Sequence, residues 1–160
     1  LFERGLDPGK RAQLGAHYTS REDIECLIEP VVMAPLRREW AATRAIIESL
    51  LETGRKQRPA EPVARPTGGQ LTKARNEAQT FIRQALYRLA EVRVLDPACG
   101  SGNFLYVTLQ KLKDLEKEII VFALDHGFTA LLPMVGPWQL RGIEINQYAA
   151  ELAQMVIWIG

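Results

Sequence analysis

The sequence predicts an α/β fold, in which the first βαβα unit of a doubly wound parallel sheet follows a helical N-terminal region. Three observations predict it. The stretch "VLDPACGSGNFL", residues 94–105, joins a short apolar strand to a helix through a glycine-rich turn. A second short strand, "LRGIEI", occupies residues 140–145, and a helical pattern follows each strand. Strands that alternate with helices pair in parallel, because each connection must cross back over the sheet. We therefore assign residues 1–90 to a helical region and residues 91–160 to the first half of a sheet domain.

The first helix is expected to begin after Ser20. Residues 1–16 have the character of a loop, and Ser20 with Asp23 three positions later forms a weak capping box. Apolar residues then follow at helical spacing: Ile24, Leu27, Ile28 and Val31. Because Pro30 and Pro35 interrupt this pattern, we expect a kink or a break there.

Two further helices complete the N-terminal region. The first has one apolar face and is expected to end at Gly54, and its face comprises Leu36, Trp40, Thr43, Ile47 and Leu51. Helical spacing resumes at Leu71, with Ala74, Ala78, Phe81, Ala85 and Leu89. Residues 54–70, "GRKQRPAEPVARPTGGQ", are rich in proline and glycine and poor in apolar side chains. They are predicted to form a flexible loop.

The second half of the chain supplies the strands and their helices. A strand at residues 92–95 leads through the glycine turn into a long helix with an apolar stripe of Leu105, Leu109, Leu112 and Ile119. A loop at residues 123–138 precedes the strand at 140–145, and the closing helix is expected to bury Ala149, Leu152, Ala153, Val156 and Ile157. Two strands do not make a stable sheet alone, and the chain starts without methionine. We therefore interpret it as part of a longer protein.

The composition is that of an ordinary soluble domain. The 160 residues carry a net charge of +1, with 47% hydrophobic and 24% charged residues. The two cysteines, Cys26 and Cys99, predict neither a disulfide framework nor a zinc site, and no metal is expected. They fit a reducing, cytoplasmic environment. No apolar run approaches the roughly 20 residues that a membrane span requires, and no signal peptide is visible.

Basic residues gather in one part of the chain. Residues 37–75 contain nine lysines and arginines but only four glutamates. An arm that contacts DNA would use such charges on phosphates. We favour a solvated loop and helix face, because "RKQRPAEPVARP" contains no aromatic residue and includes an acid.

The glycine turn predicts a small-molecule site. Gly100 and Gly102 are free to adopt positive φ and have no Cβ to block a ligand. The N–H groups that open the next helix then face a cleft at the carboxyl end of the strand. A phosphate loop needs lysine and serine or threonine where Asn103 and Phe104 stand, and a dinucleotide fingerprint needs a third glycine where Leu105 stands. Both of these phosphate-binding patterns are therefore excluded.

Two carboxylates suggest which ligand the cleft takes. Asp96 ends the first strand and would repel phosphates, but it would attract the ammonium group of S-adenosylmethionine, which carries no phosphate. Glu144 ends the second strand and is suited to accept two ribose hydroxyls. Two simpler interpretations stay open: the glycine pair as a tight turn without a ligand, and Glu144 as a solvated strand end.

Three segments resemble the adenine-N6 DNA methyltransferases, in the group whose cofactor motifs precede the catalytic motif. "LDPACGSGNFL" resembles their cofactor-binding motif, "LGAHYTS" at residues 14–20 resembles their N-terminal motif, and "GIEINQYAAELAQMVIWIG" resembles their acidic-strand motif. The residues between them are similar to large restriction enzymes that fuse a nuclease and a methyltransferase in one chain. The resemblance covers most of residues 14–160 and is weakest at 54–70.

The resemblance implies a Rossmann-like methyltransferase fold and a set of cofactor residues. Tyr18 and Thr19 would line the methionine or adenine side of the cofactor. Asp96 would hold the ammonium, Glu144 the ribose hydroxyls, and Ile145 would pack on the adenine. The methionine arm would be held and closed in by the residues of the turn and the following helix start: Pro97, Ala98, Cys99, Gly100, Gly102, Asn103 and Phe104.

Other interpretations of single residues remain open beside these roles. Tyr18 is also compatible with a packed aromatic residue at a helix start. Cys99 is interpreted as a small packing residue and not a nucleophile, because no basic partner is evident. His17 and His126 are interpreted as surface residues or as residues behind the site.

The resemblance also implies an activity and its partners. The complete protein would transfer a methyl group from S-adenosylmethionine to adenine N6 in double-stranded DNA, within a restriction–modification system, after flipping the base from the duplex. The catalytic motif of that group, Asn or Asp followed by Pro-Pro and an aromatic residue, is absent, because the sequence contains neither Pro-Pro nor Asn-Pro. The motif is expected beyond Gly160, so this chain alone is not expected to methylate. The alternatives are methylation of RNA or protein, and a non-catalytic scaffold module of the same fold.

Overall fold

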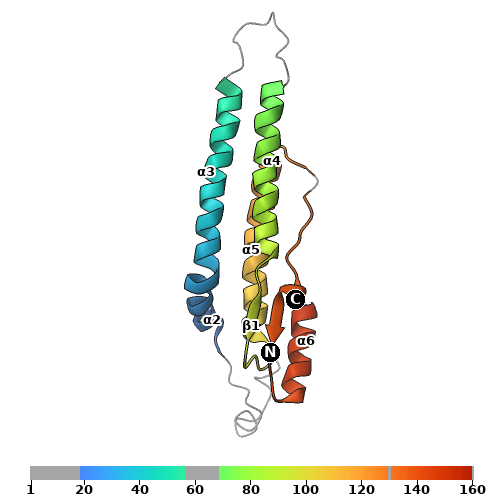
Figure 1. Ribbon diagram of the computed structural model, residues 1–160. Coiled ribbons are helices and arrows are strands. Elements are labelled where there is room, and N and C mark those ends of the chain that lie inside the picture. Colours follow the sequence, from blue (N-terminus) through green and yellow to red (C-terminus); the bar gives the residue numbers. More distant parts are fainter. Residues whose placement is uncertain (1–18, 57–68, 130, 160) are drawn as a thin grey trace, which may run out of the picture.

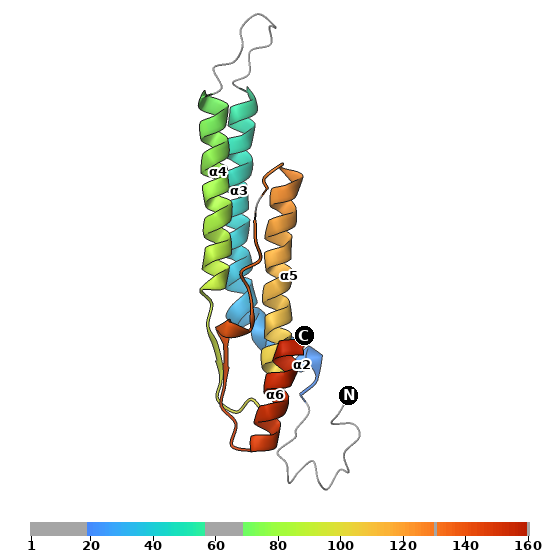
Figure 2. The same ribbon diagram turned by 90° about the vertical axis from the view of Figure 1, so that its right-hand side faces the viewer.

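A computed structural model describes residues 19–56, 69–129 and 131–159. The molecule is elongated (Figure 1), and its length comes from the helices α3 (Ala34–Lys56) and α4 (Gly69–Ala90), which lie side by side. Helix α5 (Asn103–Asp125) packs along their lower part. A small sheet and helix α6 (Gln147–Ile159) lie at the lower end of α5 (Figure 2). The lower end of α5 is therefore the place where the sheet, α6 and the helical region meet.

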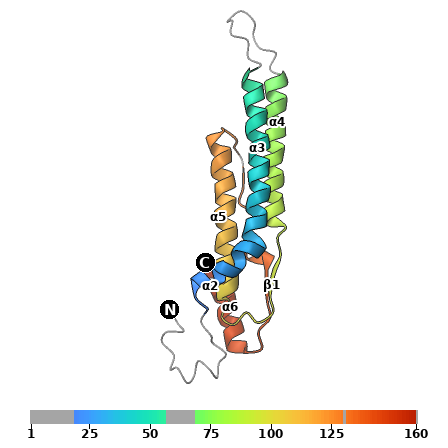
Figure 3. The same ribbon diagram turned by 90° about the vertical axis from the view of Figure 1, so that its left-hand side faces the viewer.

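Helix α2 (Arg21–Ile28) begins as the sequence predicts. The Ser20 hydroxyl oxygen accepts a hydrogen bond from the Asp23 backbone N–H at 3.1 Å, which caps the helix. The two prolines bend the chain without breaking it. Pro30 lies in a π-helical turn, Glu29–Met33, that leads directly into α3 (Figure 3), and Pro35 occupies the first turn of α3, where a missing N–H is tolerated. The kink is confirmed. Leu27 and Val31, however, are 60% and 74% exposed and do not belong to the buried face.

The expected end of the second helix at Gly54 is wrong. Helix α3 continues through this residue to Lys56. A glycine inside a helix costs only about 1 kcal/mol, and the long contact of α3 with α4 offsets that cost. Helix α4 begins at Gly69, two residues before the expected Leu71. Most of the predicted flexible loop, residues 57–68, lies outside the described residues.

The sheet consists of two parallel strands, β1 (Val94–Asp96) and β2 (Leu140–Gly142), joined by α5. Val94 pairs with Leu140 and Asp96 with Gly142. The strands are shorter than the predicted ranges 92–95 and 140–145. Past Gly142 the chain hydrogen-bonds to the end of β1 and to the glycine turn. The Ile143 N–H donates to the Asp96 carbonyl, and the Ile143 carbonyl accepts a hydrogen bond from the Cys99 N–H. The predicted order of strand, helix, strand and helix is confirmed.

The helices that cover the sheet differ in how completely they are buried. The predicted stripe on α5 is fully buried, with Leu105, Leu109, Leu112 and Ile119 each at most 2% exposed. On α6, Ala153 is buried, but Val156 is 36% exposed. The apolar face predicted for the closing helix is therefore only partly buried, and α5 is its main packing partner. None of the described helices is long and apolar enough to cross a membrane.

Two buried polar side chains fix the connection from α5 to β2. The Glu116 carboxylate on α5 accepts the backbone N–H groups of Met134 and Val135, at 2.5 and 2.9 Å. Gln139, fully buried in a short 3-10 helix (Pro137–Gln139), donates to the carbonyls of Leu89 and Val92 and accepts the Gly136 N–H. Gln139 therefore ties the end of α4 and the chain leading into β1 to the start of β2.

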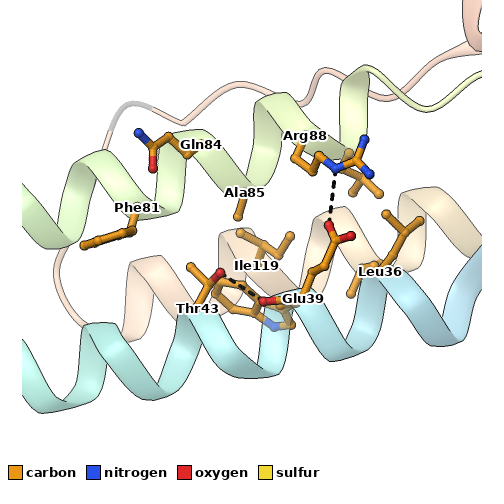
Figure 4. Close-up of a pocket in the computed structure, with 11 residues that line it drawn as sticks. Leu36, Glu39, Thr43, Phe81, Gln84, Ala85, Arg88 and Ile119 are labelled. Atoms are coloured by element: carbon orange, nitrogen blue, oxygen red, sulfur yellow. Dashed lines mark hydrogen bonds and ion pairs between the residues drawn. The ribbon is translucent and has the colours of Figure 1, made fainter.

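The helical region has an open pocket of about 180 Å³ between α3, α4 and α5. Its lining is mainly apolar, and an ion pair between Arg88 and Glu39 at 3.2 Å stands at its side (Figure 4). Trp40 packs edge-on against Phe122 beside it. None of the predicted cofactor residues lines this pocket, so it is not the candidate site.

Candidate functional site

The turn between β1 and α5 has the backbone conformation that its glycines predict. Gly100 has a φ of +53° and Gly102 a φ of +83°, both in the left-handed region that side chains disfavour. The Gly102 N–H donates to the Cys99 carbonyl at 2.8 Å, which closes the turn. Gly102 is also the N-cap of α5, and no side chain caps that helix. The first N–H groups of α5 therefore keep the partial positive charge of an uncapped helix start.

The two glycines serve different purposes. A Cβ added at Gly100 would meet nothing within 4 Å, so this residue borders open space. A Cβ at Gly102 would lie 2.9 Å from the Ala153 Cβ on α6, so this residue lets two helices approach. One glycine therefore leaves room for a ligand, and the other allows close packing.

The structure brings Asp96 and Glu144 to the same turn. Asp96 accepts the Ala98 N–H on Oδ1 at 3.1 Å, which braces the start of the turn. Glu144 accepts the Gly100 N–H on Oε2 at 2.9 Å and the Asn146 N–H on Oε1 at 2.8 Å. The Glu144 carboxylate thus joins the glycine turn to the end of the second strand.

The electrostatics of the turn favour an ionised Glu144. The Asn146 N–H lowers the pKa of this carboxyl below its usual 4.5; partial burial opposes the shift, and the N–H groups of Gly100 and Ile145 add to it. Glu144 is therefore a carboxylate at neutral pH. A carboxylate has about four acceptor positions, so these backbone N–H groups leave acceptor capacity for a ligand.

Cys99 packs between the strands and α5. A Cβ at Gly142 would approach the Cys99 Sγ to 2.6 Å, so the thiol occupies the space that this glycine leaves. Burial raises the pKa of Cys99, and the charges of Asp96 and Glu144 raise it further. The thiol therefore stays protonated at neutral pH, which agrees with its interpretation as a small packing residue and not a nucleophile.

Among the described residues of the N-terminal motif, Thr19 contacts the first residue of α5. Asn103, the first residue of α5, donates from its side-chain Nδ2 to the Thr19 carbonyl at 2.9 Å. Tyr18, His17 and the rest of the segment 14–18 lie outside the described residues. The role predicted for Tyr18 stays a prediction.

The remaining predicted residues differ in exposure. Ile145 is fully exposed, and Pro97 and Ala98 are exposed beside the turn. Phe104 packs against the core. Their roles toward a cofactor stay predictions. His126 lies at the opposite end of α5, where its ring contacts Phe122, so it does not take part in the turn.

Two site residues were missed by the reasoning from sequence. Asn146 donates its backbone N–H to Glu144, and its side-chain oxygen accepts the Ala149 N–H at 3.2 Å at the start of α6. The signal was an asparagine directly before a helical pattern, a frequent helix cap. Gly142 was missed as well, although a glycine inside a strand often marks a close approach of another segment.

Comparison with known proteins places this geometry in a family. The family model for the DNA-methyltransferase domain of MmeI matches residues 71–160, which include β1, the glycine turn, β2 and α6. The chain belongs to this family. The resemblance to DNA methyltransferases of restriction–modification systems is thereby confirmed.

Relatives and a solved structure agree with the family. The chain is 29% identical over 150 residues to DNA methyltransferase A of Bacillus subtilis, which covers 93% of this chain. It is 32% identical over 85 residues, 52% of its length, to a putative type II restriction enzyme and methyltransferase of Methanocaldococcus jannaschii. The solved structure of the Type IIL restriction–modification enzyme MmeI in complex with DNA superposes with a TM-score of 0.63 and 29% identity, covering 99% of this chain.

The chain corresponds to a small part of each of these proteins. It spans 13% of the Bacillus subtilis methyltransferase, 7% of the Methanocaldococcus jannaschii enzyme and 18% of the MmeI chain. Membership of the MmeI methyltransferase family therefore describes the fold and relationship of this segment.

Proposed function

We propose that the chain is the S-adenosylmethionine-binding part of a DNA methyltransferase that methylates adenine N6 within a restriction–modification system. The observation that carries the proposal is a pair of carboxylates, Asp96 at the end of β1 and Glu144 two residues past the end of β2. Both accept backbone N–H groups of a turn whose Gly100 borders open space. The family supplies the reaction class, since its members are DNA-methyltransferase domains.

The residues present fit S-adenosylmethionine by charge and by space. Asp96 uses one carboxylate oxygen within the turn, and its negative charge is proposed to attract the cofactor's ammonium. Glu144 is ionised and keeps acceptor capacity for ribose hydroxyls. Ile145, fully exposed next to it, offers an apolar surface for the adenine ring. Once bound, the cofactor supplies a methyl group on a sulfonium centre.

The start of α5 completes the fit. The methionine arm ends in a carboxylate as well as an ammonium, and an uncapped helix start attracts an anion. Gly102 turns the chain into this helix with no side chain over the turn. The chain's own residues therefore bind and orient the cofactor, while the catalytic Asn/Asp-Pro-Pro-aromatic motif is proposed to lie beyond Gly160.

The order of the motifs supports two further parts of the proposal. These are adenine N6 as the target atom and a Rossmann-like sheet that extends beyond the two strands. The segment "LGAHYTS" precedes the glycine turn, and the acidic strand follows it. This order resembles the adenine-N6 group. The βαβα unit is proposed as the first unit of its sheet. Double-stranded DNA is the proposed partner, and the MmeI structure, a complex with DNA, supports it.

Cofactor binding is tested by calorimetry on the complete protein that carries this chain. The wild type is expected to bind S-adenosylmethionine, and Asp96→Asn and Glu144→Gln are each expected to weaken it by about ten- to a hundred-fold, because each removes a charged hydrogen-bond acceptor. Asp125→Asn, at the far end of α5, is the matched control and is expected to bind like the wild type. Wild-type binding that both site variants leave unchanged would contradict the site, and tight binding of a phosphate-bearing dinucleotide instead would contradict the ligand.

The target base is tested by methylating duplex DNA with the same protein. Nucleoside analysis by mass spectrometry is expected to find N6-methyladenine, and Glu144→Gln is expected to reduce the yield at low cofactor concentration. Methylated cytosine would refute the adenine assignment. Methyl transfer to RNA or protein, with unmodified DNA, would support the alternative substrate class, and binding without any transfer would support a scaffold.

A further inference from the structure

Helix α2 is fastened to the first half of α5 by polar contacts. Arg21 donates to the Gln110 side-chain oxygen at 2.9 Å, and Lys111 pairs with Glu25 at 3.1 Å. Ile24 of α2 is fully buried and belongs to the hydrophobic core. These contacts hold α2 across the lower part of α5 (Figure 3).

One contact differs from the others in its position. Asn103 is the first residue of α5 and directly follows Gly102, and its Nδ2 donates to the Thr19 carbonyl. Thr19 directly follows the segment 14–18 and precedes the N-cap of α2, Ser20. The Asn103 amide therefore joins the end of the N-terminal motif to the glycine turn itself.

We propose that Asn103 is a positioning residue, which holds Thr19 beside the glycine turn and thereby sets the affinity for the cofactor. This inference rests on the proposed function. From the sequence, Asn103 was expected to contact the cofactor. The inference assigns it a different role, in which it acts through Thr19.

Two features explain why a side chain performs this task here. The backbone N–H of residue 103 belongs to the helix start, so it does not reach sideways toward α2. Thr19 lies before α2, where its carbonyl has no helical partner of its own. An asparagine at the first position of α5 supplies a donor at the right distance, and an aspartate of the same size would turn an oxygen toward the carbonyl.

The experiment compares three variants of the complete protein: Asn103→Ala, Asn103→Asp and the matched control Gln110→Ala, which removes an α2–α5 contact away from the turn. Asn103→Ala is expected to raise the Kd for S-adenosylmethionine about three- to ten-fold, the range of one net hydrogen bond, and Asn103→Asp at least as much. Gln110→Ala is expected to stay within about two-fold of the wild type. At saturating cofactor, kcat is expected to stay near the wild-type value for all three, so the effect appears in KM.

A second measurement separates positioning from direct contact. Amide hydrogen exchange of residues 19–25 is expected to speed up in both Asn103 variants without cofactor, because the start of α2 loses its tie to α5. A raised Kd with unchanged exchange would mean that Asn103 touches the cofactor directly, and faster exchange with unchanged Kd would mean that the tie is only structural. Either result overturns the inference, as does an Asn103→Asp variant that binds like the wild type. A wild-type protein that binds no S-adenosylmethionine would instead refute the proposed function.

Discussion

Replacing Gly102 with alanine is expected to lower the free energy of unfolding by about 3 kcal/mol, through two separate physical effects. The residue has a φ of +83°, which costs an alanine about 1–2 kcal/mol. The new Cβ would also lie 2.9 Å from the Ala153 Cβ and 3.0 Å from its Cα, so α6 must move away from the turn. Overpacking of this kind costs about 1–3 kcal/mol more.

Gly100→Ala is the matched control for this prediction. Its φ is +53° and its Cβ would meet open space, so only the conformational cost remains and the loss is expected to be about 1–2 kcal/mol. Urea unfolding of both variants, followed by circular dichroism, measures the difference. Ala153→Gly is expected to recover part of the loss in the Gly102→Ala background only. Equal losses at the two glycines would contradict the packing role of Gly102.

Replacing Gln139 with leucine is expected to cost about 3–4 kcal/mol of stability, even though leucine is similar in size. The side chain is fully buried and makes three hydrogen bonds, to the Leu89 and Val92 carbonyls at 2.9 and 3.1 Å and from the Gly136 N–H at 3.0 Å. Leucine would leave the buried Gly136 N–H without its partner, which costs about 1–3 kcal/mol. The Leu89 and Val92 carbonyls would keep only the Val92 N–H and the Arg93 side chain, and each lost hydrogen bond costs about 0.5–1.5 kcal/mol more. The urea concentration at the unfolding midpoint is expected to fall, while the dependence of the unfolding free energy on urea concentration stays unchanged.

Gln139→Glu tests which of the three bonds matter. Glutamate keeps the acceptor for Gly136 but presents a charged oxygen to two carbonyls, so it is expected to destabilise at least as much as leucine at neutral pH. Glu77→Gln, at an exposed position of α4, is the control and is expected to change stability by less than about 0.5 kcal/mol. If Gln139→Leu also fell within that margin, Gln139 would not be what joins the two strands.

Patterns that depend on neighbouring residues were predicted well from the sequence. Ser20 caps α2, the apolar stripe of α5 is buried from Leu105 to Ile119, and Gly100 and Gly102 adopt positive φ. Each of these features depends on residues within one or two turns of the chain. The chemistry of a cap, a helical stripe or a glycine turn is therefore visible in the sequence itself.

Features that depend on distant partners were not predictable in the same way. Helix α3 continues past Gly54 because α4 packs beside it, and β2 ends at Gly142 because the chain then bonds to the turn. The polar residues Glu116 and Gln139 gave no signal, since a buried carboxylate or amide looks like a surface residue until its backbone partners are known. Glu144 was expected at the site, but its bond to the Gly100 N–H was not.

The sequence by itself determined that an apolar strand, a glycine turn and a helix follow one another, with Asp96 at the strand end and Glu144 at the end of the next strand. Only the tertiary structure decided three contacts: Glu144 accepts the Gly100 N–H, Gly102 packs against Ala153 of α6, and Asn103 donates to the Thr19 carbonyl. The physical reason is range. Backbone preferences and helical periodicity act between residues a few positions apart, whereas these three contacts join residues 44 to 84 positions apart, and only the folded chain brings their atoms together.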